Sequence, residues 1–442
     1  MPNMKNFFRN VSSHDFTKLL LDKSYVLFLC SVVFSQVAFN MMNVVLIFIV
    51  FNLTSSNFLV SMILLISLLP QVFLSFVGGV IADSRNKKNI LVLGNIGRAV
   101  VVFLLVFFNG SVVWVYILAL LVSIVTQFYI PAETPIIPKL VPEKLLIAAN
   151  SLFGLALFGS ILIGYVIAGP ALTMLGNSNV FLVLAGLFAI AGVFANLIPQ
   201  HALKANNSLK NKKVKVQVEE SLKSYFIDTY KLLLGTVGVA PSFILLIVSQ
   251  VVIMVIAIIV PGYAKDILHI GVENVSLLLF APAALGMIVA ALAVGSVLKE
   301  TNRDKLMDAG VILSGIVLLL LPIVSSSTFQ AVVANINLIF PFFHINDLVV
   351  VFIFSFFAGI GNALIFIPAQ TTMQEKIPEN FRSKMYGLLF ALIGLFSLLP
   401  IVLVGGLADS LGVNFVLIII GSLILGGGVI RIVSLNIIKK VV

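Results

Sequence analysis

Polar side chains are rare inside the long apolar runs of this chain, and their positions indicate what chemistry those runs offer. Gln36, Asn40 and Asn43 follow one another at steps of four and three residues, which places them on one face of a helix. Their amide groups donate and accept hydrogen bonds without changing charge. This face is therefore suited to orienting a bound solute or, alternatively, to hydrogen bonding between helices.

Two ionisable side chains lie within or at the end of such a run. Glu133 is the nearest candidate for a proton carrier, because no Asp or Glu lies in the middle of any run. Arg98 lies early in the third run, where an ionisable residue is a functional hypothesis by default. The alternative for Arg98 is a side chain that extends to the nearby water. Its expected partner is Asp83 or Glu133.

Motifs of several enzyme classes are absent from the sequence. It contains no GxxxxGK[ST] loop, no HExxH and no GxSxG, so neither nucleotide hydrolysis nor these forms of peptide or ester hydrolysis are expected. Cys30 is the only cysteine, which excludes an internal disulfide and a CxxC site. We expect no enzymatic activity, no catalytic residue, no cofactor and no metal site.

The composition indicates how these residues are positioned. Hydrophobic residues make up 60% of the chain and charged residues 10%, and the mean hydropathy is +1.18. Runs of about 20 apolar residues are long enough to cross a bilayer as helices. Twelve can be read, at roughly 25–52, 58–82, 90–108, 112–131, 148–172, 180–199, 241–262, 275–298, 307–325, 347–368, 385–408 and 414–434.

The distribution of basic residues predicts the orientation of these spans. If the N-terminus is cytoplasmic, all of the 27 Lys and Arg residues except Lys265 fall in or next to segments on the cytoplasmic side. Basic residues resist translocation, so this bias predicts both termini in the cytoplasm. The net charge of +10 is thereby explained without nucleic acid, which we do not expect as a partner.

The two halves of the sequence are related. Residues 130–134 (IPAET) match residues 367–371 (IPAQT) at an offset of 237, and Asn86 matches Asn302 at an offset of 216. The predicted fold is therefore all-α and membrane-integral, with twelve helices in two pseudo-symmetric six-helix bundles. The bundles are predicted at 1–200 and 241–442. A cytoplasmic linker is predicted at 201–240, with an amphipathic helix over its second part, from Glu219 to Leu234.

The loop after the second span carries the most specific motif. Residues 78–88 (GGVIADSRNKK) resemble the signature loop of the major facilitator superfamily, with Asn86 in place of the usual Gly. The segment Pro131–Asn150 resembles the branch of bacterial macrolide-type, siderophore and lysophospholipid transporters. The predicted cytoplasmic gate consists of the signature-loop positions together with Arg98: Gly79, Asp83, Arg85, Lys87, Lys88 and Arg98.

The resemblance implies roles for several of these residues. Asp83 would contact the start of span eleven, near Ser383–Tyr386, and close the cytoplasmic side; the alternative is a solvated loop acid. Lys299 replaces Asp at the equivalent position of the second half, so this contact is expected once only. Spans one, four, seven and ten line the cavity in the family, and each carries uncharged polar groups here: Gln36, Asn40, Asn43, Gln127, Gln250 and Asn362.

The function that these features predict is secondary-active export of an amphipathic or apolar small molecule by alternating access, with Glu133 as the proton carrier of an antiporter. Span four lacks Arg, and Tyr165 stands where exporters of this branch have Pro, which weakens the antiporter signature. The alternatives are a flippase for lysophospholipid or other lipid, and a transport-inactive receptor or scaffold. We expect a monomer surrounded by lipid in the plasma membrane of a prokaryote.

Overall fold

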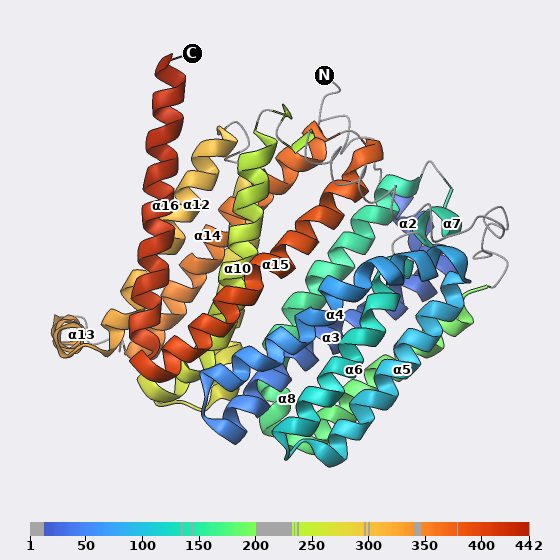
Figure 1. The fold of residues 1–442 in the computed structure, drawn as a ribbon, viewed down its shortest axis with the longest axis horizontal. Coiled ribbons are helices and arrows are strands. Elements are labelled where there is room, and N and C mark those ends of the chain that lie inside the picture. Colours follow the sequence, from blue (N-terminus) through green and yellow to red (C-terminus); the bar gives the residue numbers. More distant parts are fainter. Residues whose placement is uncertain are drawn as a thin grey trace. The chain divides into compact units, whose positions relative to one another are not determined.

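The computed structural model describes residues 13–133, 136–142, 145–199, 238–295, 301–339, 346–377 and 379–441, with positions 232, 233, 235, 236 and 298. In these residues the backbone forms helices joined by short turns, as Figure 1 shows. The chain divides into two compact units, Met1–Leu53 with Ile66–Lys212, and Thr54–Leu65 with Lys213–Val442. Most of the predicted helix over Glu219–Leu234, like most of the linker, lies outside the described residues.

The first unit holds the helices of the first six predicted spans. An apolar run in lipid has no water to satisfy its backbone, so it forms a helix in which each peptide group is paired. The helices are α3 (Lys23–Thr54), α4 (Asn57–Ser84), α5 (Lys87–Phe108), α6 (Val112–Glu133) and α8 (Leu146–Leu197), with the short α2 (Ser13–Leu21) and α7 (Ile137–Leu140). The first residues of α4, up to Leu65, group with the second unit.

Helix α8 carries both predicted spans five and six. Its 52 residues would measure about 78 Å as one straight helix, far more than the hydrocarbon thickness of about 30 Å. Gly176 interrupts it with φ 75° and ψ 171°, a conformation that glycine adopts without steric cost. The chain therefore crosses twice within α8. Among the described residues eleven helices are long and apolar enough to span a membrane, and α8 counts once among them.

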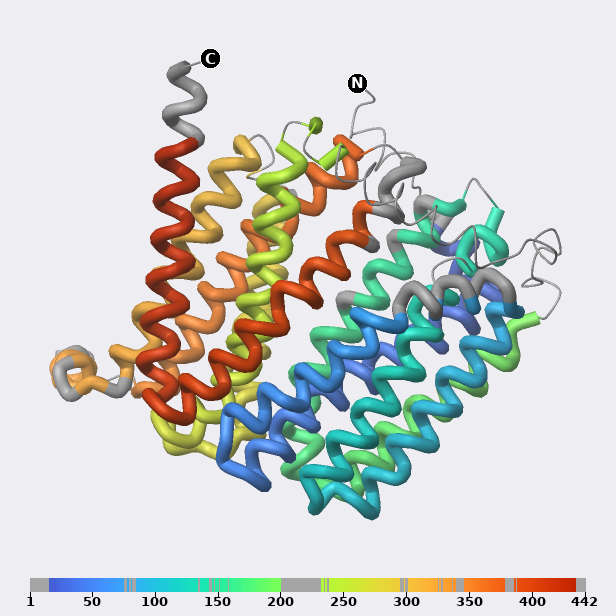
Figure 2. Tube along the Cα trace, viewed as in Figure 1, coloured from blue at the N-terminus to red at the C-terminus, as the bar shows by residue number. Residues whose placement is uncertain are grey.

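The second unit holds the other six spans. Span seven is α10 (Val239–Gly262) with η5 (Tyr263–Ile267), and span eight is η7 (Ser276–Phe280) with α11 (Ala281–Gly295), joined by η6 (Val272–Asn274). Within this unit α16 packs along α12, as the red and amber tubes of Figure 2 show. The remaining elements are α12 (Arg303–Leu320), η8 (Leu321–Ser325), α13 (Ser327–Ile339), α14 (Asp347–Lys376), α15 (Glu379–Leu411) and α16 (Val413–Val441).

The sequence repeat corresponds to a structural repeat. Asn86 caps α5 by accepting a hydrogen bond from the backbone N–H of Lys88 at 3.0 Å. Asn302 caps α12 by accepting from the N–H of Asp304 at 2.8 Å. Asn is among the preferred N-cap residues, because its side-chain oxygen satisfies a free N–H of the first turn. The departure from Gly at position 86 therefore has a local structural reason.

One helix was not predicted. Between α12 and α14 the chain forms α13, which is too short to cross a bilayer. Figure 1 shows α13 end-on, while the neighbouring spans of its unit run across the view. Its direction therefore differs from that of the neighbouring spans.

Candidate functional site

The acid predicted as a proton carrier lies inside the first unit. Glu133, the last residue of α6, is only 4% exposed. Its Oε1 accepts a hydrogen bond from the Tyr129 hydroxyl, one turn earlier on α6, at 3.0 Å. Its Oε2 accepts from Nε2 of Gln36 on α3 at 3.3 Å. Both donors are neutral, so neither supplies a charge to balance the carboxylate.

Arg98 of α5 is more deeply buried, at 1% exposure. Its Nη2 donates to Oδ1 of Asn95 at 2.7 Å and to Oγ of Ser35 at 2.9 Å. Its Nε donates to the Gly94 carbonyl one turn earlier on α5, at 3.2 Å. The side chain therefore lies in the interior of the unit and does not extend to water.

Two aromatic rings lie against this guanidinium. Its central carbon lies 4.0 Å from the Tyr129 ring centroid and 4.8 Å from that of Phe188 on α8. Such contacts stabilise a cation, most strongly where water is excluded. Tyr129 therefore links the two charged residues, since its ring lies on Arg98 and its hydroxyl donates to Glu133.

These contacts define one site, which we call the Arg98–Glu133 cluster. Its side chains come from the three helices α3, α5 and α6, and its members lie as many as 98 positions apart in the sequence. Within this cluster, one cation and one titratable acid are accompanied by neutral polar side chains. A carboxyl in such surroundings can take up or release a proton when its hydrogen bonds or its access to water change. The members are Ser35, Gln36, Asn95, Arg98, Tyr129 and Glu133.

The predicted cavity residues divide between the two units. In the first unit Asn40 is 8% exposed, its Nδ2 donates to the carbonyl of Gln36 at 2.7 Å, and its Cβ lies against Gly164 of α8. These contacts are those of a residue between packed helices, the alternative that the sequence left open. Gln127 is also buried and donates to the Ser123 carbonyl at 3.3 Å. Gln36 is the member that the structure joins to the cluster.

The other three cavity residues are partly exposed within their units. Asn43 lies on α3 in the first unit. Gln250 on α10 and Asn362 on α14 lie in the second unit. Their convergence with Gln36 on a single cavity stays a prediction.

The residues of the signature loop differ in how far they are exposed to solvent. Arg85 is exposed and Lys87 is 7% exposed, although both belong to the same short basic segment. Lys88 is partly exposed and supplies the N–H that Asn86 caps. Gly79 and Asp83 lie in the last turns of α4, and their side-chain environments are outside what the structure describes. The predicted contact of Asp83 therefore stays a prediction.

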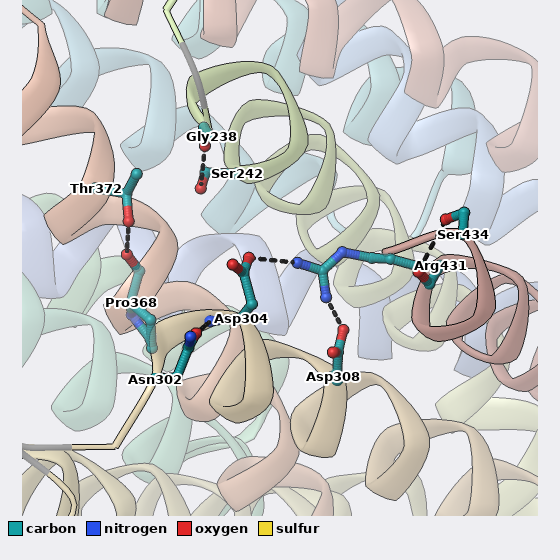
Figure 3. A network of polar contacts seen from close by, with 9 residues as sticks. All are labelled: Gly238, Ser242, Asn302, Asp304, Asp308, Pro368, Thr372, Arg431 and Ser434. Carbon is teal, nitrogen blue, oxygen red and sulfur yellow. Dashed lines mark hydrogen bonds and ion pairs between the residues drawn. The ribbon is translucent and has the colours of Figure 1, made fainter. Parts of the chain in front are cut away.

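A second charged network, in the other unit, was missed by the sequence reasoning. Arg431 of α16 forms ion pairs with Asp304, at 3.0 Å, and with Asp308, both on α12. Figure 3 shows the guanidinium reaching toward both carboxylates. A step of four residues places the two acids on one helix face, and this spacing was a readable signal. The network joins α12 to α16.

The loop before α12 contributes another ion pair. Arg303, the counterpart of Lys87 in the repeat, makes a two-pronged contact with Glu375 at the end of α14, at 2.7 and 3.0 Å. Both side chains are 40% or more exposed, so water screens the pair and its contribution to stability is small.

Comparison with known proteins extends the sequence resemblance. The family model described as "Major Facilitator Superfamily" matches residues 28–344. An "Uncharacterized MFS-type transporter YfiS" from Bacillus subtilis (strain 168) is 25% identical over 388 residues, which are 87% of this chain and 86% of that protein. These two matches do not identify the finer branch that the sequence suggests.

Solved structures share the fold at low identity. The POT family transporter PepTSo superposes with a TM-score of 0.70 at 12% identity, covering 95% of this chain and 99% of that one. The nucleoside transporter NupG superposes with a TM-score of 0.66 at 11% identity, covering 92% and 98%. A POT family transporter in complex with 5-aminolevulinic acid gives 0.68 at 15% identity, covering 92% and 95%. At these identities the likeness concerns the fold alone.

Proposed function

The chain belongs to the major facilitator superfamily, and on that premise we propose that it is a secondary-active exporter of an amphipathic or apolar small molecule, driven by proton exchange at Glu133. The observation that carries the proposal is the Arg98–Glu133 cluster. It holds a titratable acid at 4% exposure with neutral hydrogen-bond donors in an apolar bundle. Acids in such positions mark proton relays in transporters.

The cluster explains why Glu133 rather than Arg98 changes its charge. Arg98 donates through Nη2 to Ser35 and Asn95 and through Nε to the Gly94 carbonyl, and a guanidinium stays protonated in proteins. Arg98 is therefore a fixed positive charge beside the carboxyl. Deprotonated Glu133 makes the cluster neutral, and protonated Glu133 leaves it with a net positive charge. Loss or gain of one proton thus changes the charge of the interior of this unit.

Gln36 can couple the binding of a solute to the protonation of Glu133. Its amide donates to Glu133 and belongs to the polar face of α3 that was predicted to meet the solute. A solute that takes this amide as its own donor removes a hydrogen bond from the carboxylate. Proton and solute binding are then linked, and by thermodynamic reciprocity each changes the affinity of the other by the same factor.

The character of the solute follows from the scarcity of charged residues within the predicted spans, where no Asp or Glu lies in the middle. A lining of amides and apolar side chains binds mainly by burial of apolar surface, with a few hydrogen bonds for orientation. A carboxylate or phosphate solute would require a cation at mid-depth, and predicted spans seven to eleven carry none there. We place the protein in a prokaryotic plasma membrane with both termini in the cytoplasm.

The test is flux in proteoliposomes for a panel of neutral amphipathic compounds and a lysophospholipid, with and without a pH gradient. We expect the flux of at least one neutral compound to depend on the gradient. Glu133→Gln should keep solute binding and lose that dependence. The control is Glu273→Gln, the same change in the segment between spans seven and eight, which should behave as the parent protein. Full gradient dependence in Glu133→Gln would reject Glu133 as the carrier.

A further inference from the structure

The best-satisfied carboxylate described in the second unit is that of Asp409, near the end of α15. Its Oδ1 accepts hydrogen bonds from the backbone N–H of Asn57 at 2.7 Å and from its Nδ2 at 3.0 Å. Its Oδ2 accepts from Oγ of Ser56 at 2.5 Å and from the N–H of Phe58 at 3.1 Å. All three partners lie at the start of α4, and Thr54–Leu65 belongs to the same unit as α15.

These hydrogen bonds cap a helix from outside its own chain segment. The first N–H groups of a helix have no partner within it, and the positive end of its dipole favours an anion. Ser56 caps α4 from within, since its Oγ accepts from the N–H of Leu59 at 3.2 Å. Asp409 satisfies the two preceding N–H groups, those of Asn57 and Phe58. The start of α4 is therefore bound to α15 by a carboxylate that matches its free donors.

Close packing supports the same contact. A Cβ built on Gly405, one turn before Asp409, would lie 2.7 Å from Oγ of Ser61 and 2.9 Å from the carbonyl oxygen of Asn57. Only a residue without a side chain lets the two backbones come this near. Ser61 is fully buried as a result, with 0% exposure.

The sequence places a counterpart of Asp409 at the other end of α4. Residues 78–84 (GGVIADS) close α4, and residues 405–410 (GGLADS) close α15, with one residue fewer between the glycines and the alanine. The predicted topology takes spans two and eleven across the membrane in opposite directions, so the two acids are expected on opposite sides of the membrane.

We propose that the contact between Asp409 and the start of α4 closes the predicted outer side, and that this contact breaks and re-forms in each transport cycle. We call it the Asp409 latch. It is the opposite-side counterpart of the contact expected for Asp83. The helix α4 is the element that it acts on, because its first residues group with the second unit while Ile66 and the residues after it group with the first. Release of Asp409 frees the start of α4 from α15. The inference rests on the proposed function only in requiring an alternating-access cycle.

The exposure of Asp409 suits it to this role. Asp409 is exposed to water, although both oxygens of its carboxylate accept hydrogen bonds. Water can therefore replace the four hydrogen bonds when the contact opens, and the free-energy difference between the two states is small enough for other ligands to shift. A deeply buried carboxylate would instead resist separation.

The test measures access to the protected side of the contact. Ser61→Cys, in a Cys30→Ser background, places the only thiol against Gly405, and its labelling by a charged maleimide is followed in nanodiscs, where both membrane faces are open to the reagent. Asp409→Asn and Asp409→Ala should raise the labelling rate about tenfold, the factor that corresponds to loss of roughly one charged hydrogen bond. Asp266→Asn, an exposed acid in the segment after α10, is the matched control and should leave the rate unchanged.

Folding and function are separated by two further readouts. Variants are compared only if they elute as single species; if Asp409→Ala does not, Asp409→Asn and Ser56→Ala carry the test. An unchanged labelling rate in correctly folded Asp409 variants overturns the latch. Because no solute is added, a raised rate supports it even where the flux assay finds no proton coupling, a result that would reject only the role of Glu133.

Discussion

Replacement of Arg98 by Lys tests whether the Arg98–Glu133 cluster stabilises the first unit. Lys keeps the positive charge but lacks the forked donors of the guanidinium. In the native protein one nitrogen, Nη2, donates to both Ser35 and Asn95, at 2.9 and 2.7 Å. A single ammonium on a shorter, tetrahedral head cannot reproduce these bonds together with that to the Gly94 carbonyl.

The magnitude follows from those contacts. A hydrogen bond from a charged donor contributes about 1.5–3 kcal/mol, and an acceptor left buried without a partner adds to the cost of losing it. Lys retains part of the cation–π contact with Tyr129, so that loss is partial. We expect Arg98→Lys to lower the free energy of unfolding by about 2–4 kcal/mol.

The assay uses the only tryptophan of the chain. Trp114 lies on α6 in the first unit, with its ring 5.1 Å from that of Phe108, so its fluorescence reports on the unit that holds the cluster. Denaturant unfolding in detergent micelles gives the midpoint for each variant. Arg85→Lys, the same change at an exposed site, is the control and should shift stability by less than about 0.5 kcal/mol. Equal midpoints for Arg98→Lys and the parent protein would refute the reasoning.

Two further predictions concern packing and topology. Gly164→Ala should destabilise the first unit by about 1–3 kcal/mol in the same assay, because the added methyl group would lie 2.9 Å from the Asn40 Cβ. In the control Gly159→Ala, on the same helix, the methyl group meets nothing within 4 Å, so this change should be neutral or stabilising. Equal effects of the two changes would contradict the assigned α3–α8 contact. Single cysteines in a Cys30→Ser background should be labelled from outside intact cells at positions 266 and 330 but not at 212 or 440, and the reverse pattern would invert the predicted orientation.

Much of the fold was readable from the sequence because the bilayer restricts the choices. A run of about 20 apolar residues in lipid forms a helix, so the spans were predicted with errors mainly at their ends. The repeated Asn86 and Asn302 were visible as a pattern, and the structure gives both the same capping role. The predictions failed for α13, whose 13 residues carry no comparable constraint on length.

The sequence by itself also determined which residues are chemically unusual in their surroundings. Glu133, Arg98 and Gln36 stand out as polar groups in apolar runs, since each would be costly against lipid. Their types and depths follow from counting residues along each helix. Composition and charge bias likewise predict a membrane protein and its orientation.

Only the tertiary structure decided which of these groups meet. Glu133, Arg98, Asp409 and Arg431 each have at least one partner outside their own helix, up to 353 positions away in the sequence. Whether two side chains touch depends on the rotation of each helix about its axis and on its neighbours, and apolar residues on every face leave that rotation undetermined. Packing at small residues and satisfaction of buried polar groups fix it, and both belong to pairs of helices rather than to one sequence segment.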